Sequence, residues 1–293
     1  MRHAYECPLR WADLDLQGHV NNVVYVDYLQ EARVDMLRTH APEPRTEALA
    51  EGVVVVRHEV TYRAPLQYLS ATVKIESWVT EIRAASFTMA YEVFHDAPDE
   101  DGGRVVYLRA STVLTPYVFA SERPRRISPE EREALTLFLE PEGQARGATL
   151  APVEREGAGH YALHVRFSDV DVYGHVNNVK YFEYFQEARI RLHAQLLRDV
   201  DGPAHPTMVV AQTDVDYRVP ILFRPEPYDV WSRIVRVGAR SMSIESEICD
   251  GDLVLSRARV AMVFVDAATG RAVEPDPAYR ELLLAQVPVT PGC

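Results

Sequence analysis

Two short loops of this 293-residue chain carry the same set of polar side chains. The first reads DxDxxGHVNN from Asp13 to Asn22, and the second repeats it from Asp169 to Asn178. A carboxylate just before a helix can act as a nucleophile or as a general base. The free N–H groups and the dipole of the helix N-terminus stabilise negative charge beside it. This pattern predicts chemistry at a carbonyl carbon, and a thioester suits it best because its thiolate leaves readily.

We expect the members of each loop to divide the work. The second Asp of each pair, Asp15 or Asp171, is expected to face the carbonyl carbon, attacking it or deprotonating a water. Backbone N–H groups near Val20 to Asn22 are expected to stabilise the oxyanion. The supporting residues predicted around the two carboxylates are Gly18, His19, Asn21, Asn22, Gly174, His175, Asn177 and Asn178.

Structural roles for the same side chains stay open at this point. An Asp in such a loop commonly satisfies turn and helix-end N–H groups, which fits Asp13 best and applies to Asp15 as well. A glycine there supplies a backbone conformation that other residues dislike, a histidine is often only hydrogen-bonded, and an asparagine often only caps the helix. Tyr25 and Tyr28 are expected to pack in the core or at a domain interface, with rings that also line an acyl pocket. Tyr25 and Tyr181 are the tyrosines expected to bind substrate.

A metal site is the weaker interpretation of these carboxylates. Each loop offers one histidine, and the helix-borne Glu31 and Glu187 come turns later, which is not the ligand set of an ordinary site. Three widely spaced cysteines, Cys7, Cys249 and Cys293, form no metal-binding spacing and are typical of reduced thiols in a cytoplasm. We therefore expect no metal and no cofactor.

The elements that must position these loops repeat with them. The stretches Arg10–Arg33 and Arg166–Arg189 are identical at fifteen of 24 positions, and Val60–Pro65 likewise matches Val215–Pro220. Such long self-similarity indicates duplication of a whole domain. The sequence predicts a first module over 1–140, a linker over 141–159 and a second module over 160–293.

Each copy predicts the same order of elements: one strand, the polar loop, a long amphipathic helix, four strands and a short closing helix. With one long helix among five strands, the sheet must wrap that helix, which makes an α+β fold with a mostly antiparallel sheet. Pro42 and Gly202-Pro203 are expected to stop the long helices, and Ser128 and Asp276 to cap the short ones. The predicted long helices and strands are Tyr5–Trp11, Asn21–Arg38, Val53–Arg63, Thr72–Ile82, Ser86–Phe94 and Val105–Thr115, then Tyr161–Phe167, Asn177–Leu197, Met208–Arg218, Tyr228–Val237, Ser241–Cys249 and Leu253–Val265.

Charge and hydropathy exclude several classes of partner. The chain has 31 Lys and Arg against 43 Asp and Glu, a net charge of −12, which disfavours binding to nucleic acid or to an anionic membrane. No apolar stretch is long enough to span a bilayer, and charges replace the apolar core of a signal peptide near the N-terminus. We expect a soluble, cytoplasmic protein.

The repeated signature, Arg10-x-x-Asp13-x-Asp15-x-x-Gly18-His19-Val20-Asn21-Asn22-x-x-Tyr25, resembles the hot-dog-fold acyl-CoA thioesterases of the 4-hydroxybenzoyl-CoA thioesterase-like branch. The resemblance implies a tandem hot-dog fold, in which the two modules form within one chain the dimer that the family uses. It implies hydrolysis of an acyl-CoA or acyl-ACP (acyl carrier protein) thioester, with Asp15 and Asp171 as nucleophile or general base. The GHVNN loop is most similar to the fatty acyl subgroup, which includes plant acyl-ACP thioesterases.

The resemblance also implies where the substrate binds. Coenzyme A is often held by an Arg/Lys-x-Ser turn between the third and fourth strands, which Arg83 with Ser86 and Arg240 with Ser241 match loosely. A homodimer of chains, with four modules, is the expected assembly. Two other functions remain open: a non-catalytic acyl-CoA-binding or sensing protein, and a hydratase or dehydratase on the same fold.

Overall fold

The computed structural model describes residues 1–40, 52–68, 72–97, 103–141, 147, 149–198 and 207–288. The chain divides into two compact units, Met1–Gly147 and Ala148–Cys293. The predicted helix stops at Pro42 and Gly202-Pro203, and Cys293, lie outside the described residues. The described later part of the predicted linker, 149–159, falls within the second unit.

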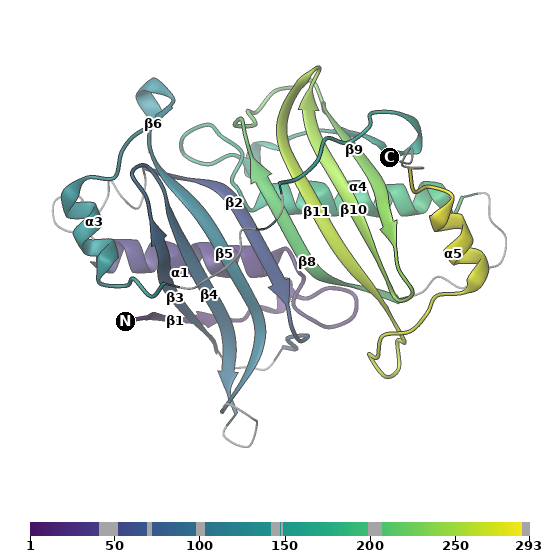
Figure 1. Cartoon of the computed structure of the whole chain (residues 1–293), viewed down its shortest axis with the longest axis horizontal. Helices are drawn as coiled ribbons and strands as arrows, with labels where there is room; N and C mark the ends of the chain where they lie inside the picture. Colours follow the sequence, from purple (N-terminus) through teal and green to yellow (C-terminus); the bar gives the residue numbers. More distant parts are fainter. Residues whose placement is uncertain are drawn as a thin grey trace, which may run out of the picture. The chain divides into compact units, whose positions relative to one another are not determined.

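The first unit is one long helix against an antiparallel sheet (Figure 1). Its strands lie in the order β1-β3-β4-β5-β2, and every neighbouring pair is antiparallel. A two-residue strand pairs with the end of β5. The elements are β1 (His3–Pro8), α1 (Val24–His40), β2 (Val53–Tyr62), β3 (Thr72–Ile82), β4 (Phe87–Asp96), β5 (Arg104–Val118), β6 (Arg123–Pro124) and α3 (Pro129–Thr136).

The second unit repeats this architecture. Its strands lie in the order β7-β9-β10-β11-β8, again antiparallel, with α4 on one face of the sheet. Each unit is therefore a hot-dog module, and the prediction of an α+β tandem hot-dog fold is confirmed. The elements are β7 (His160–Leu163), α4 (Lys180–Leu196), β8 (Thr207–Tyr217), β9 (Tyr228–Val237), β10 (Ser241–Asp250), β11 (Leu253–Val265) and α5 (Pro277–Leu284).

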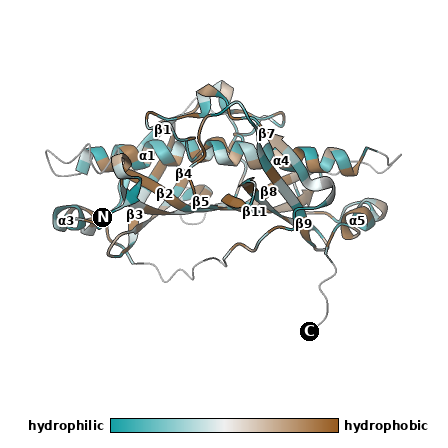
Figure 2. Cartoon of the chain, turned by 90° about the horizontal axis from the view of Figure 1, so that it is seen from above, coloured by the Kyte–Doolittle hydropathy of each residue, from teal (hydrophilic) through white to brown (hydrophobic). Residues whose placement is uncertain are grey.

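The long helix fills each module because one of its faces is apolar. Leu29, Ala32 and Met36 of α1 are buried, whereas Asp27 and Glu31 are exposed. Figure 2 shows hydrophobic and hydrophilic residues alternating along the helix. In the second module Leu192 of α4 packs with apolar residues of the sheet and with Tyr279 of α5. Burying one such side chain stabilises the folded chain by about 1.5–3 kcal/mol, which makes the helix–sheet layer the core of each module.

Most predicted elements lie within a few residues of the observed ones, and the first strand of each module is present but ends three or four residues earlier than predicted. The strands end at Pro8 and Leu163, and short 3₁₀ turns at Trp11–Asp13 and Phe167–Asp169 follow. The cause is local, because the Asp at the end of each turn accepts the N–H of the Arg that precedes it. A backbone N–H bonded within its own turn no longer serves the sheet.

The short helices confirm the predicted caps. Ser128 Oγ accepts the N–H of Glu131 at 3.2 Å, and the Glu131 carboxylate accepts the N–H of Ser128 at 2.8 Å. Asp276 Oδ1 accepts the N–H groups of Ala278 and Tyr279 at the start of α5. The bonds are reciprocal in α3 and one-way in α5, and in both helices they satisfy helix-end donors that would otherwise lack partners.

Candidate active site

The first Asp of the loop fastens the loop to the helix that follows it. Asp13 Oδ2 accepts the backbone N–H of Arg10 at 2.9 Å and the hydroxyl of Tyr28 at 2.5 Å. The carbonyl of Asp13 accepts the N–H of Asn21 at 2.9 Å. Burial and the neighbouring Asp13 carboxylate raise the pKa of Tyr28, which keeps its hydroxyl a proton donor at neutral pH. Asp13 therefore serves as a structural anchor.

The second Asp uses one oxygen for the loop and leaves the other unpaired. Asp15 Oδ1 accepts the N–H of Gln17 at 2.8 Å and of His19 at 3.2 Å, which folds the side chain over its own turn. Among the described residues, Oδ2 of this half-buried side chain makes no hydrogen bond. Gly18 adopts φ +77° within this turn, which explains the glycine. The turn thus fixes the carboxylate and leaves one oxygen available to a substrate.

The helix N-terminus beside this loop keeps one backbone donor unused. The N–H of Val20 is bonded to Leu66, and Asn21 Oδ1 accepts the N–H of Val23, so helix α1 begins only at Val24. Within the part of the chain that the structure describes, the N–H of Asn22 has no hydrogen-bond partner. Of the N–H groups predicted to stabilise an oxyanion, that of Asn22 is therefore the one left available.

Tyrosines hold the loop against the end of β2. The Tyr62 hydroxyl donates to the carbonyl of Asn22 at 2.7 Å, and the hydroxyl of the buried Tyr25 is hydrogen-bonded to the backbone of Leu66. The ring centroids of Tyr25 and Tyr62 lie 5.7 Å apart, edge to face. The structure thus gives Tyr25 a positioning role in the core, and contact between its ring and an acyl chain stays a prediction.

The second module repeats this geometry at the corresponding positions. Asp169 Oδ2 accepts from the N–H of Arg166 and the Tyr184 hydroxyl, and Asp171 Oδ1 accepts from the N–H groups of Tyr173 at 2.9 Å and His175 at 3.2 Å. Asp171 is more exposed than Asp15. Asn177 Oδ1 accepts the N–H of Val179, and the Tyr217 hydroxyl donates to the carbonyl of Asn178. The N–H of Ile221 donates to the hydroxyl of Tyr181, and Gly174 adopts φ +81° as Gly18 does φ +77°.

The predicted coenzyme A turns lie away from the loop of their own module. Arg83 donates its N–H to the carbonyl of Ser86 in the β3–β4 turn, and its side chain pairs with Glu81. Phe87, next to that turn, pairs with Leu114 of β5, whereas Tyr62, which bonds the loop, pairs with Leu108 of the same strand. The turn and the loop are therefore six residues apart along β5, or about 20 Å. Ser241 closes the matching β9–β10 turn with Gly238, and Arg240 is exposed there. Binding of coenzyme A at these turns stays a prediction.

Sequence reasoning missed the tyrosines that position the loop. Tyr28 and Tyr184 each stand fifteen residues after the Asp that they bond, and Tyr62 and Tyr217 occupy the same place in the second matching segment. The signal was present, because all four recur at the same positions of both copies. The missing step was to connect a strand-end tyrosine to a loop about 40 residues earlier.

Metal sites and membrane-spanning helices are both absent from the part of the chain that the structure describes. No group of three or more His, Cys, Asp or Glu among them is arranged to hold a metal ion. None of the helices among them is long and apolar enough to cross a membrane.

Comparison with known proteins assigns the family. The model of the Thioesterase-like superfamily matches residues 9–135 and again residues 165–283. This chain belongs to that superfamily. The two matched segments coincide with the two hot-dog modules, and each contains one DxDxxGHVNN loop. A relative from Bacillus subtilis, the uncharacterized protein YsmA, is 32% identical over 125 residues, which cover 41% of this chain and 81% of the relative.

Solved structures of similar fold span both modules. A putative oleoyl thioesterase from Lactobacillus plantarum superposes with a TM-score of 0.72 at 15% identity, covering 90% of this chain and 95% of that one. An acyl-ACP thioesterase from Bacteroides thetaiotaomicron gives 0.66 at 14% identity over 89% and 97%. The 12:0-ACP thioesterase from Umbellularia californica gives 0.67 at 15% identity over 89% and 93%. At these identities the likeness shows the tandem hot-dog fold.

Proposed function

We propose that this chain hydrolyses acyl thioesters of coenzyme A or acyl carrier protein to a free acid and a thiol. The observation that carries the proposal is the pairing of two unused groups in one loop: Oδ2 of Asp15 and the N–H of Asn22. Membership of the Thioesterase-like superfamily supports the same reaction. Fatty acyl thioesters are the preferred substrates in this proposal, because the structural neighbours include thioesterases named for oleoyl and 12:0 chains.

In this proposal each group of the loop has a place in the reaction. The substrate carbonyl oxygen accepts the N–H of Asn22, where the helix N-terminus favours the negative charge of the tetrahedral intermediate. Asp15 Oδ2 either attacks the carbonyl carbon, expelling the thiolate and leaving an anhydride that water cleaves, or takes a proton from the water that attacks. Both routes yield one acid and one thiol for each water consumed. Asp171 has the same place in the second loop.

The decisive test replaces both carboxylates without changing their shape. We expect Asp15→Asn together with Asp171→Asn to lower kcat at least about 100-fold, since a positioned general base contributes about 10²–10⁴-fold. Each single variant should keep about half the activity if the two sites work independently. Thiol release is measured across acyl-CoAs of graded length, aromatic acyl-CoAs and acyl-ACP, which also identifies the substrate.

The controls separate chemistry from folding. The double variant should keep the unfolding midpoint of the parent within a few degrees, because an amide oxygen can still accept the two loop N–H groups. Asp252→Asn, an exposed carboxylate in the β10–β11 turn, should leave turnover unchanged. Parent-level thiol release by the double variant on every thioester that the parent cleaves would refute this assignment of the two carboxylates.

A further inference from the structure

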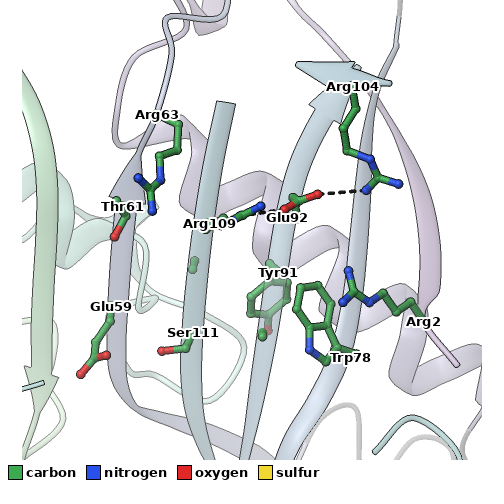
Figure 3. Close-up of a pocket in the computed structure, with 12 residues that line it drawn as sticks. Arg2, Glu59, Thr61, Arg63, Trp78, Tyr91, Glu92, Arg104, Arg109 and Ser111 are labelled. Atoms are coloured by element: carbon green, nitrogen blue, oxygen red, sulfur yellow. Dashed lines mark hydrogen bonds and ion pairs between the residues drawn. The ribbon is translucent and has the colours of Figure 1, made fainter. Parts of the chain in front are cut away.

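Exposed apolar side chains border the polar loop of each module. Part of the first module's surface carries charges that pair with one another instead, as where Arg104 and Arg109 both donate to Glu92 (Figure 3). Around the loops the exposed groups include large aromatic and aliphatic side chains, which mark a binding surface where they gather. They are Trp11, Leu16 and Tyr68 in the first module, and Phe167, Val172, Tyr173, Leu222 and Phe223 in the second.

An exposed aromatic pair is common to both loops. The rings of Phe167 and Phe223 lie edge to face with their centroids 6.1 Å apart, and those of Trp11 and Tyr68 lie likewise at 5.9 Å. Phe167 is 83% exposed and Trp11 is 76% exposed, so neither ring is part of the core. Because the pair occupies the same positions in both copies, a difference in what the two loops bind must come from other residues.

Two apolar residues adjoin the carboxylate of the second loop. The N–H of Tyr173 donates to Asp171 Oδ1 at 2.9 Å. Leu222 pairs with His175 in an antiparallel bridge, which places their Cα atoms about 5 Å apart, and the N–H of His175 also donates to Asp171 Oδ1. The buried Tyr228 hydroxyl accepts the N–H of Leu222 and donates to its carbonyl, which fixes that backbone. Tyr173 is 37% and Leu222 is 49% exposed, so both side chains offer apolar surface beside the carboxylate.

The break between Arg198 and Thr207 falls far from this loop. Arg198 follows the end of α4 and Thr207 begins β8. The loop adjoins the beginning of α4 and the end of β8, where the Tyr217 hydroxyl bonds the carbonyl of Asn178. The 17 residues of α4 span about 25 Å. The side chains beside the second carboxylate therefore lie at the end of the module that is remote from this break.

The first loop has carboxamides at the same two positions. The N–H of the exposed Gln17 donates to Asp15 Oδ1 at 2.8 Å, and Gln67 is bridged to His19. Within the described part of the chain, neither carboxamide has a hydrogen-bond partner. A carboxamide offers an acceptor oxygen and two N–H donors. An apolar group lying over it leaves these unpaired, whereas a hydroxyl can bond to them, so the first loop suits a more polar ligand than the second.

From these differences we propose that the two loops select different acyl thioesters. The second loop takes thioesters with a plain hydrocarbon chain next to the carbonyl, which packs against Tyr173 and Leu222. The first loop takes thioesters with a hydroxyl near the carbonyl, which bonds to Gln17 and Gln67. This inference rests on the proposed function and adds to it a division of substrates. The share of activity that each single Asp→Asn variant keeps then depends on the acyl group.

The test isolates each loop in the full chain. Asp171→Asn leaves the carboxylate of the first loop, and Asp15→Asn leaves that of the second. Thiol release gives kcat/KM for dodecanoyl-CoA and 3-hydroxydodecanoyl-CoA, which differ by one hydroxyl. We expect the ratio of kcat/KM, plain over hydroxylated, to be at least about tenfold higher in Asp15→Asn than in Asp171→Asn, because one unmatched polar or apolar contact changes kcat/KM by about tenfold or more.

Exchanging the residues between the loops assigns the preference. Gln17→Tyr with Gln67→Leu, added to Asp171→Asn, should raise the ratio to that of the second loop. Tyr173→Gln with Leu222→Gln, added to Asp15→Asn, should lower it. All four positions are exposed, so melting curves should show folded variants.

The loop tip supplies the matched control. Leu16→Val installs the residue of the second loop at a fully exposed position and, added to Asp171→Asn, should leave the ratio unchanged. The inference is overturned if both single variants are active with equal ratios, if only one of them is active, or if neither exchange moves the ratio. It is also overturned if Leu16→Val moves the ratio as far as the exchange does. If neither single variant releases thiol from any thioester that the parent cleaves, the proposed function fails together with this inference.

Discussion

One buried histidine should make the second module sensitive to acid. Nε2 of His193, on α4, is buried and has no hydrogen-bond partner within the described residues, while Nδ1 lies 3.4 Å from the Tyr279 hydroxyl of α5. Burial, and after it the positive charge of Arg189, lowers the pKa of His193 from 6.5 to about 4. The first module has Leu37 at the corresponding helix position, and that side chain cannot titrate. The two modules should therefore respond differently to pH.

The sign and size follow from proton linkage. Because the folded pKa lies below the unfolded one, the unfolded chain binds an extra proton between pH 6.5 and about 4. The stability associated with the neutral ring is present above pH 6.5 and is lost as the pH falls towards 4. At about 1.4 kcal/mol per pH unit, the full loss is about 3 kcal/mol, of which about 2 kcal/mol is gone at pH 5.

The assay follows each module separately. Hydrogen exchange, corrected for the intrinsic rate at each pH, should show protection falling between pH 7 and pH 5 in peptides from α4 and α5. Peptides from the part of α1 before His40 should change much less; His40 itself, at the end of α1, also has a pKa lowered by burial and is left out of the comparison. His193→Leu, which installs the residue of the first module, should remove most of this fall. The reasoning is refuted if the variant keeps the acid sensitivity of the parent, or if α1 loses protection as much as α4.

Three further predictions concern local contacts. Tyr28→Phe removes the hydroxyl bonded to Asp13 and should lower the free energy of unfolding in urea by about 1.5–3 kcal/mol. It should also lower kcat, because the loop loses an anchor. An unchanged urea midpoint would contradict this. In Gly18→Ala the added Cβ meets no atom within 4 Å, but the alanine must adopt φ +77°. Calorimetry should therefore show a free energy of unfolding lowered by about 1–2 kcal/mol from backbone strain alone. An unchanged stability would argue against the turn conformation. Ser128→Ala removes the cap of α3 and should lower the stability of that helix by about 1 kcal/mol. Hydrogen exchange should become faster at the first amides of α3. The first amides of α5, whose cap is intact, should not change.

The fold was predictable because its signals are local and occur twice. Period-two strands, one amphipathic helix and the repeat are visible in the chain itself, and they require a sheet that wraps a helix. The predicted ends of the first strands were wrong for an equally local reason. The residues Tyr5–Trp11 alternate like a strand, but the carboxylate of Asp13 accepts the N–H of Arg10 and turns the chain. Side-chain bonds to the backbone compete with sheet pairing, and hydrophobic patterning does not register them.

The site was only half predictable, for a different reason. The motif identified the loop and its place before a helix favoured Asp15 over Asp13, and the family resemblance supported the same choice. Tertiary contacts make the distinction physical: Tyr28 reaches back from the helix to occupy Asp13, and nothing described occupies Oδ2 of Asp15. A residue at fixed spacing can be recognised from sequence, but whether its second oxygen is already taken depends on packing.

The two modules share the geometry of the polar loop but differ in the packing around it. The bond from the loop N–H to the second Asp measures 3.2 Å in both copies, between His19 and Asp15 and between His175 and Asp171. The same two copies differ at the helix position that is His193 in one and Leu37 in the other. The loop geometry depends on hydrogen bonds within about ten residues, so it persists while the packing around it changes. Acid sensitivity can thus differ between modules that hold their carboxylates in the same way.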